Sequence, residues 1–333
     1  MDIYLYNLVL LFVVMEKMYD LVCLTNAMMD VSLKVEDSVL NELGVKKGTF
    51  NGIGSIGLRE RDYFMNDVLL NNSHSLFLGG SPANVVFTGS SLGLRGAVCG
   101  SVGRDELGTM YSAMFSANDV DTYLRTNDGD TGVCYCLISS DGERTFLVDI
   151  GCSAEFDVHD DICSNAKIFH TSGYELGDNP DVVLKSAGLV KEFGGLISFD
   201  LASYRAVSEN KGNVNSMLDL TDILFASYEE GEGVFGSSSR GEIKEGLKGL
   251  DKIVALKDGK NGSVVLSGGK EWEIPVYPAQ TLVNTNGAGD SYAAGFLNGF
   301  VKGLPLCGCG EMGSLIASKV CSVERANLGK RNV

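Results

Sequence analysis

The sequence has little positive charge and few histidines. Its 27 lysines and arginines are outnumbered by 43 aspartates and glutamates, which gives a net charge of −16. This balance argues against a nucleic-acid backbone or an anionic membrane as a partner. The 3 histidines show no metal-ligand spacing, so we expect structural or solvated roles for His74, His159 and His170. A small phosphate ligand remains compatible with this charge, because backbone N–H donors act at short range.

Zinc-like cysteine pairs and an apolar run of membrane length are also missing. The 9 cysteines are odd in number and scattered, which favours reduced thiols in a cytoplasmic protein. The apolar run at residues 3–14 is shorter than the roughly 20 residues of a membrane span. It follows an acidic start and has no small-residue cleavage site, unlike a secretory signal. We expect residues 1–17 to be an extension outside the core, with a weak anchor as the alternative.

Strand-like and helix-like segments alternate along the second half of the chain. This alternation predicts a parallel sheet with helices on both faces, and ligands bind such sheets at the carboxyl ends of the strands. Residues 18–330 then form a single three-layer α/β/α domain. The β-rich segments at about 25–55 and 130–150 can form a small accessory sheet, or lid, over the site. The predicted strands of the second half are 167–171, 196–200, 223–226, 252–256 and 263–266.

Residues 52–57 match the G-x-G-x-x-G pattern of dinucleotide-binding proteins. The preceding segment is polar and basic instead of a buried strand, and the region about 20 residues further on offers no acid for a ribose. We therefore reject a dinucleotide site there.

Two other glycine turns lead into helices. The first, residues 79–84 (Gly-Gly-Ser-Pro-Ala-Asn), precedes a helix of small residues that can pack closely. The second, residues 284–290 (Asn-Thr-Asn-Gly-Ala-Gly-Asp), opens onto another small-residue helix. The N–H groups of Gly287, Ala288 and Gly289 can point into one concavity, and the helix start adds partial positive charge.

Such a turn suits a phosphate, and Asp290 lies in the middle of it. A carboxylate there repels phosphate unless it has a task, and the obvious task is to take the proton of an attacking hydroxyl. The alternative is an ordinary helix N-cap, for which aspartate is a favoured residue.

Taken together, the two turns resemble the ribokinase-like, PfkB-type family of carbohydrate and nucleoside kinases, over residues 18–326. Residues 79–84 with 100–108 match its first signature, and residues 287–290 match its second. Within the family the chain looks most like the adenosine kinase branch and its bacterial relatives, because residues 26–30 fit the N-x-x-x-D of that branch. The resemblance implies a ribokinase-like fold, a mostly parallel sheet and a β lid.

The family's residue roles carry over by position. Asp290 matches the catalytic base, and Gly287, Ala288 and Gly289 match the anion hole. Arg144 resembles an arginine brought to the phosphates by lid closure, with a solvated hairpin arginine as the alternative. The resemblance implies substrate-binding roles for Asn26, Asp30, Gly79, Gly80, Asn84 and Tyr174, although core packing is an equal alternative for Tyr174. It implies nucleotide-binding roles for Ser227, Glu230, Lys257, Gly259 and Gly262.

Three positions depart from the family motifs. Lys257 replaces the threonine of T-x-G-x-x-G, and Ser227 replaces the asparagine of N-x-x-E, in which Glu230 helps to place Mg²⁺ through water. Asn284 replaces the aspartate that often belongs to a monovalent-cation site, which puts potassium activation in question.

The resemblance implies an ATP-dependent, Mg²⁺-assisted kinase acting on a primary hydroxyl of a ribose-containing substrate, with adenosine preferred. One alternative is a sugar kinase of the same family for ribose or fructose. Another is a nucleoside-binding paralogue with weakened catalysis. We expect small-molecule partners, no nucleic acid or membrane, and a monomer or homodimer.

Overall fold

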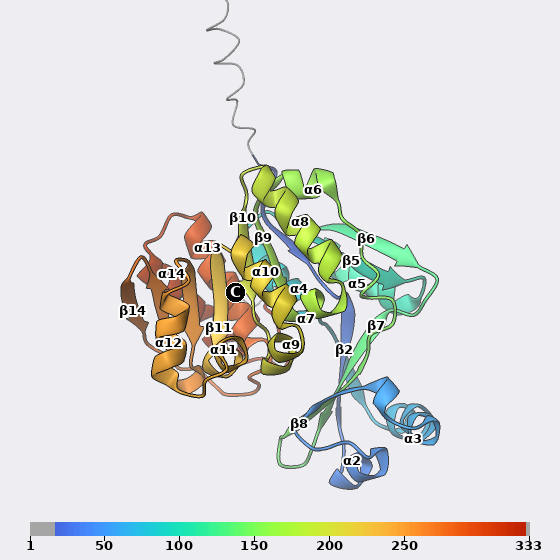
Figure 1. Ribbon diagram of the computed structural model, residues 1–333. Coiled ribbons are helices and arrows are strands. Elements are labelled where there is room, and N and C mark those ends of the chain that lie inside the picture. Colours follow the sequence, from blue (N-terminus) through green and yellow to red (C-terminus); the bar gives the residue numbers. More distant parts are fainter. Residues whose placement is uncertain (1–16, 331–333) are drawn as a thin grey trace, which may run out of the picture.

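The computed structural model describes residues 17–330, which form a large sheet covered by helices and a smaller sheet that projects from it (Figure 1). Residues 1–16 of the expected extension lie outside the described part. No helix within residues 17–330 has the length and apolar character needed to cross a membrane.

The large sheet has 9 strands in the order β14-β13-β12-β11-β10-β9-β1-β5-β6. The neighbours from β12 to β6 all pair in parallel, as the strand–helix alternation predicts. The nine strands are β1 (Tyr19–Leu24), β5 (Gly96–Gly103), β6 (Asp121–Asn127), β9 (Ala166–Ser172), β10 (Leu196–Asp200), β11 (Ile223–Ser227), β12 (Ile253–Lys257), β13 (Ser263–Ser267) and β14 (Lys270–Ile274).

Helices bury both faces of this sheet because its strands are apolar on both sides. One face packs against α4 (Ser81–Ser91), α5 (Glu106–Ser116), α13 (Ala288–Val301) and α14 (Leu306–Val320). The other face packs against α6 (Asp160–Ser164), α7 (Gly173–Asp178), α8 (Pro180–Glu192), α9 (Tyr204–Glu209), α10 (Lys211–Leu220), α11 (Tyr228–Phe235) and α12 (Arg240–Lys248). The result is the three-layer arrangement expected from the sequence.

The predicted strand at residues 263–266 does not join the parallel set. It is β13, and it pairs antiparallel with β12. Only residues 258–262 separate these two strands, and a parallel pairing needs a crossover of a dozen or more residues. The short connection therefore produces a hairpin, and β14 continues it antiparallel along the edge.

The smaller sheet, which we call the lid, has 5 strands in the order β3-β8-β7-β2-β4. They are β2 (Met28–Lys34), β3 (Phe50–Gly52), β4 (His74–Leu78), β7 (Gly132–Ile138) and β8 (Arg144–Asp149). Strand β4 and the helical segments α3 (Leu58–Tyr63) and η3 (Phe64–Leu69) lie outside the two segments expected from the sequence. Residues 52–57, the rejected dinucleotide pattern, form the end of β3 and the short helix η2 (Ile53–Ser55).

The two faces of the lid differ in chemistry. One face, with Val31, Tyr135 and Leu147, forms an apolar cluster with α2 (Asp37–Leu43) and η3. Since residues opposite one another in register share a face, the pairs Asp30–Cys134 and Ser32–Cys136 lie on the other face. The same register adds Phe146, Phe50 and Arg144 to that face.

Candidate active site

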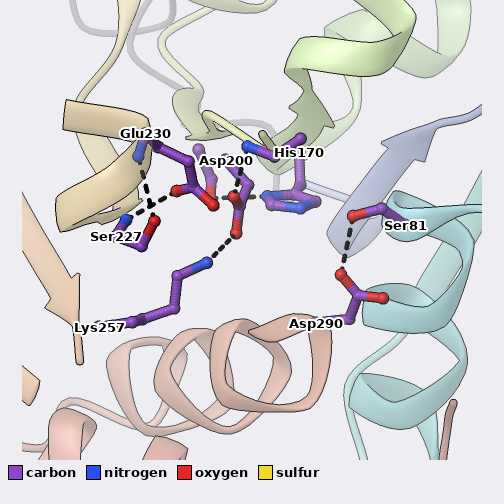
Figure 2. Close-up of polar contacts among 9 residues, drawn as sticks. Ser81, His170, Asp200, Ser227, Glu230, Lys257 and Asp290 are labelled. Carbon is purple, nitrogen blue, oxygen red and sulfur yellow. Dashed lines mark hydrogen bonds and ion pairs between the residues drawn. The ribbon is translucent and has the colours of Figure 1, made fainter. Parts of the chain in front are cut away.

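Polar residues gather where the parallel strands of the large sheet end. Asp200, Ser227 and Lys257 are the last residues of the adjacent strands β10, β11 and β12. The first turns of α4 and α13 bring Ser81 and Asp290 to the same place (Figure 2). In sheets of this kind the crevice beyond the carboxyl ends of the strands is the usual ligand site.

The start of α13 forms a group of backbone donors that we call the amide nest, made of the N–H groups of Gly287, Ala288 and Gly289. Gly287 has φ 73°, and a Cβ there would collide with the carbonyl of Ala326. Only glycine suits both constraints. In the described part of the chain the N–H groups of Gly287 and Gly289 donate no hydrogen bond, and that of Ala288 makes a long bond of 3.3 Å to Thr285. The nest therefore has donors left for an anion.

Asp290 is held beside the nest by two side-chain donors from α4. The Ser81 hydroxyl donates to Oδ1 at 2.8 Å (Figure 2). The Asn84 amide donates to Oδ2 at 2.9 Å. Burial raises the pKa of Asp290 to about 6, and these two hydrogen bonds oppose the rise. A carboxyl with this pKa is ionised at neutral pH and basic enough to accept a proton. Asp290 is not a helix N-cap here, since Gly287 holds that position.

The chain end orients Asn84, a role that the sequence did not reveal. Asn327 Nδ2 donates to Asn84 Oδ1 at 2.8 Å and to the carbonyl of Leu78 at 3.1 Å. Because Asn84 Oδ1 is thereby an acceptor, its Nδ2 must face Asp290. Asn327 is 2 % exposed, so water does not compete for this bond.

Asp30 lies near Asp290, although 260 positions of sequence numbering separate them. Burial, and then the negative charge of Asp290, raise the pKa of Asp30 to about 7. A Cβ at Gly79 would collide with the Asp30 carboxylate, so glycine is required for β2 and the α4 turn to approach so closely. The predicted base and the predicted sugar-binding acid therefore belong to one cluster.

Gly80 and Asn26 pack against each other behind this cluster. Gly80 has φ 90°, and a Cβ there would lie 2.6 Å from the Asn26 carbonyl. Asn26 is buried, and its side chain donates to Asp178 at 2.7 Å while its backbone N–H donates to Glu175 at 3.0 Å. The structure thus uses the Asn26 amide to join β1 to α7.

Aromatic rings join the lid to the core. Tyr174 stacks on Phe50 with a centroid distance of 6.2 Å and an interplanar angle of 17°, and Phe50 stacks on Phe146 at 5.0 Å. Tyr174 is 36 % exposed and Phe50 is 48 % exposed. Negative charges at Glu230, Asp290 and Asp200 contribute to the raised pKa of Tyr174, after burial. This ring therefore borders the same cluster.

Glu230 and Ser227 form a capping box at the start of α11. The Ser227 hydroxyl accepts from the Glu230 N–H at 3.2 Å, and Glu230 Oε2 accepts from the Ser227 N–H at 2.7 Å (Figure 2). Burial raises the pKa of Glu230 to about 7, while Lys257 opposes this. Serine thus replaces the asparagine of the family motif without loss of the cap.

Lys257 and Asp200 form an ion pair at the centre of the cluster. Lys257 Nζ lies 2.7 Å from Asp200 Oδ2, and the side chains are 17 % and 6 % exposed (Figure 2). Asp200 had no sequence motif to mark it, apart from its place at the end of a predicted strand. Burial lowers the pKa of Lys257, but the negative charges of Asp200 and Glu230 outweigh burial, so the pKa lies above its ordinary value.

The remaining residues singled out in the sequence lie on three other segments: the β12–β13 turn, the lid and the turn before the nest. Gly259 and Gly262 have φ 53° and 95° in the β12–β13 turn. The Asp258 N–H donates to the Gly262 carbonyl at 2.8 Å and closes this turn. Arg144 is the first residue of β8 and lies beside Cys136, on the face of the lid that carries Asp30. Asn284 is buried and donates to Glu324 at 2.7 Å, while its Oδ1 accepts from the Asn286 N–H at 2.8 Å. Asn284 therefore braces the turn before the nest.

Within residues 17–330, no group of three or more acidic, histidine or cysteine side chains is arranged to hold a metal ion by itself. Proteins that use Mg²⁺ with nucleotides often supply only one or two carboxylates and leave the other positions to phosphate and water. Glu230, which is partly buried at the start of α11, fits that donor set.

A nest of amides beside a basic carboxylate, at the carboxyl ends of parallel strands and next to a β lid, defines a small-molecule kinase. The family description "pfkB family carbohydrate kinase" matches residues 18–331. The chain belongs to the PfkB family of carbohydrate kinases, and it is a kinase of the sugar and nucleoside class. This confirms the resemblance and the fold class expected from the sequence.

Relatives by sequence carry sugar-kinase names. The chain is 29% identical over 266 residues to the 5-dehydro-2-deoxygluconokinase of Geobacillus thermodenitrificans, which covers 74% of this chain and 79% of the relative. It is 30% identical over 235 residues to an uncharacterized sugar kinase of Archaeoglobus fulgidus, which covers 69% of this chain and 92% of the relative.

Solved structures of similar shape include adenosine kinases. The adenosine kinase of Sinorhizobium meliloti is 26% identical with a TM-score of 0.84, over 93% of this chain and 96% of its own. The adenosine kinase of Schistosoma mansoni in complex with 2-fluoroadenosine has a TM-score of 0.83 over 94% of this chain and 98% of its own, and at 18% identity it supports the fold alone.

Proposed function

We propose that this chain transfers the terminal phosphoryl group of ATP to a primary hydroxyl of a nucleoside, with adenosine the preferred acceptor. The observation that carries the proposal is the position of Asp290, which lies beside an amide nest and is electrostatically coupled to Asp30. One carboxylate can then take the proton of the attacking hydroxyl while the other accepts hydrogen bonds from the sugar.

In this mechanism Asp30 and the turn at Gly79, Gly80 and Asn84 bind the sugar. Asp290 accepts the hydroxyl proton as the alcohol oxygen forms its bond to phosphorus. The bond to the bridging oxygen of the nucleotide breaks, and its electron pair leaves with ADP. The free N–H groups of the nest donate to the transferred group, and losing one such donor costs on the order of 3 kcal/mol.

The nucleotide would bind along the turns that follow β11 and β12, with Lys257, Gly259 and Gly262 nearest to it. Mg²⁺, when bound with the nucleotide, offsets phosphate charge, and Glu230 would hold its water ligands. Arg144 would approach the phosphates as the lid closes, which also excludes water from the reaction.

The aromatic residues favour a nucleoside over a free sugar. Tyr174, Phe50 and Phe146 give the mouth of the site flat apolar surfaces, which suit a nucleobase through stacking. A second candidate is a sugar kinase, since the relatives at 28–30% identity include 5-dehydro-2-deoxygluconokinases. A polar sugar acid gains nothing from stacking, so the two candidates predict different effects of removing these rings.

The test is an ADP-release assay with ATP, Mg²⁺ and a panel of nucleosides and sugars. We expect adenosine to give the highest kcat/KM, and a Phe50→Ala variant to raise KM for nucleosides about two- to tenfold, because stacking on one ring contributes roughly 0.5–1.5 kcal/mol. Phe193→Ala is the control, because it removes an exposed ring at the C-terminal end of α8. Turnover of sugar acids but not nucleosides would replace the first candidate with the second.

The role of the base is tested by Asp290→Asn. We expect turnover to fall at least 10³-fold, near the upper range for a general base, while adenosine still binds in a calorimetric titration. Normal turnover by this variant would refute Asp290 as the base, and absence of turnover by the unaltered chain with every acceptor would refute kinase activity.

A further inference from the structure

The ammonium group of Lys257 lies at the amide nest. A Cβ built on Gly289 would be 3.4 Å from Lys257 Nζ, which is an ordinary contact distance, so the ammonium lies beside the first turn of α13. Lys257 is the last residue of β12 and Gly289 belongs to the first turn of α13. Figure 2 shows the lysine side chain extending from its strand toward Asp200.

Lys257 has donors to spare. An ammonium carries three N–H donors, and in the described part of the chain Nζ makes one hydrogen bond, to Asp200 at 2.7 Å. Its side chain is 17 % exposed, so few water molecules can satisfy the other two. A mostly buried cation with unused donors, beside the Gly289 amide that also lacks an acceptor, indicates an anionic ligand that both contact.

We propose that Lys257 binds the phosphoryl group that is being transferred, donating one hydrogen bond to Asp200 and a second to a non-bridging oxygen of that group. This rests on the proposed function and goes beyond a general place in the nucleotide-binding turn. A lysine acts on phosphate as a point charge, and its charge here offsets the negative charge that the carboxylates bring to the nest. Lys257 neither gives nor takes a proton in the reaction, so the proton still passes from the alcohol to Asp290.

Asp200 holds the ammonium in place. Its Oδ1 accepts from the Ala202 N–H at 2.9 Å and its Oδ2 accepts from Lys257. Both oxygens are thus engaged, and the carboxylate is 4 % exposed. Asp200 is in this account a positioning residue, which keeps the lysine side chain extended toward Gly289 before nucleotide arrives.

The experiment compares the affinities of ADP and of the hydrolysis-resistant analogue adenylyl imidodiphosphate, by calorimetric titration with Mg²⁺. A phosphoryl contact predicts that Lys257→Met weakens the analogue about 10- to 100-fold, as expected for a hydrogen bond to a charged group, and weakens ADP less than about threefold. Lys270→Met is the matched control, since Lys270 is an exposed lysine at the start of the edge strand β14, and it should leave both affinities unchanged.

Removal of Lys257 leaves Asp200 buried without its partner, so the double variant Lys257→Met with Asp200→Asn is measured as well. The double variant removes both charges, and its affinity for the analogue should fall by the same factor as that of Lys257→Met. Asp200→Asn alone keeps the ammonium and an oxygen that can accept its hydrogen bond, so this variant should weaken the analogue clearly less than Lys257→Met does. If Asp200→Asn and Lys257→Met weaken the analogue equally, the pair is only structural and the proposal is wrong.

The outcomes separate this proposal from the proposed function. Suppose that the unaltered chain binds both nucleotides and turns over its substrate. If Lys257→Met then leaves the ratio of the analogue affinity to the ADP affinity unchanged, the role of Lys257 is wrong and the kinase assignment stands. An unaltered chain that binds neither nucleotide overturns both.

Discussion

Replacing Ser81 with alanine should move the acid side of the pH–rate profile upward. The Ser81 hydroxyl donates to Asp290 Oδ1 at 2.8 Å, and a hydrogen bond to the ionised form of an acid lowers its pKa. In the proposed mechanism Asp290 acts as a base only when it is ionised, so the rate should fall as the pH drops through its pKa. Without the Ser81 hydroxyl that pKa must rise from about 6.

The size of the shift follows from the energy of the bond. A hydrogen bond to a charged group contributes about 1.5–3 kcal/mol, and 1.36 kcal/mol corresponds to about one pKa unit. Ser81 and Asp290 are both partly exposed, so water replaces part of the lost interaction and the lower end applies. We expect an upward shift of about 1 unit, which lowers kcat/KM about tenfold below pH 6 and leaves it unchanged near pH 9.

The assay is kcat/KM against pH, since this quantity reports the free enzyme, whose hydrogen bonds are those described. Asp30 also titrates on the acid side and interacts with Asp290, so the profile shows coupled steps. Ser81 donates its hydrogen bond to Asp290, so the titration step that shifts in the variant is the one that belongs mainly to Asp290. Ser91→Ala at the other end of α4 is the control. An acid side that stays in place or moves downward would refute the reasoning.

Three further predictions concern the same cluster. Gly287→Ala should lower the free energy of unfolding by about 1–3 kcal/mol or more, because Gly287 has a positive φ and a Cβ there would collide with the Ala326 carbonyl. Chemical denaturation measures this against Gly303→Ala, where φ is 75° but a Cβ would meet open space. Equal losses of unfolding free energy in the two variants would contradict the prediction. Asn327→Asp should turn the Asn84 amide so that its oxygen faces Asp290, raising the pKa of Asp290 and moving the acid side upward; an unchanged pH profile would exclude this relay. Asp30→Ala should mainly raise KM for the alcohol, and steady-state kinetics with an unchanged KM would remove Asp30 from the sugar site.

Local sequence was a good guide to the elements. The glycine turns before α4 and α13 and the strand alternation were recognisable because backbone sterics and side-chain periodicity act over a few residues. The antiparallel β13 was missed because apolar content does not report strand direction, although the five residues before it exclude a crossover. The lid segment at residues 58–78 was missed because its helices and edge strand have no strong periodic signal.

Contacts between distant segments were beyond the sequence. Ser81 and Asn84 meet Asp290 across more than 200 positions, and Asn327 fixes the Asn84 amide from the last described turn. Asp200 carried no motif, and its importance appears only when β10 and β12 place it opposite Lys257. No spacing rule relates such residues, because the packed sheet, and not the chain between them, sets their distance.

The sequence by itself determined the class of protein: two glycine turns, a carboxylate after the second, and an acidic chain with an α/β pattern. Each of these depends on residue types within one short segment. The tertiary structure alone decided how the Asp290 carboxylate is held, that the Lys257 ammonium lies beside the first turn of α13, and that aromatic rings of the lid and core stack on one another. These features depend on which segments the folded core brings together, and that is a property of packing over the whole chain.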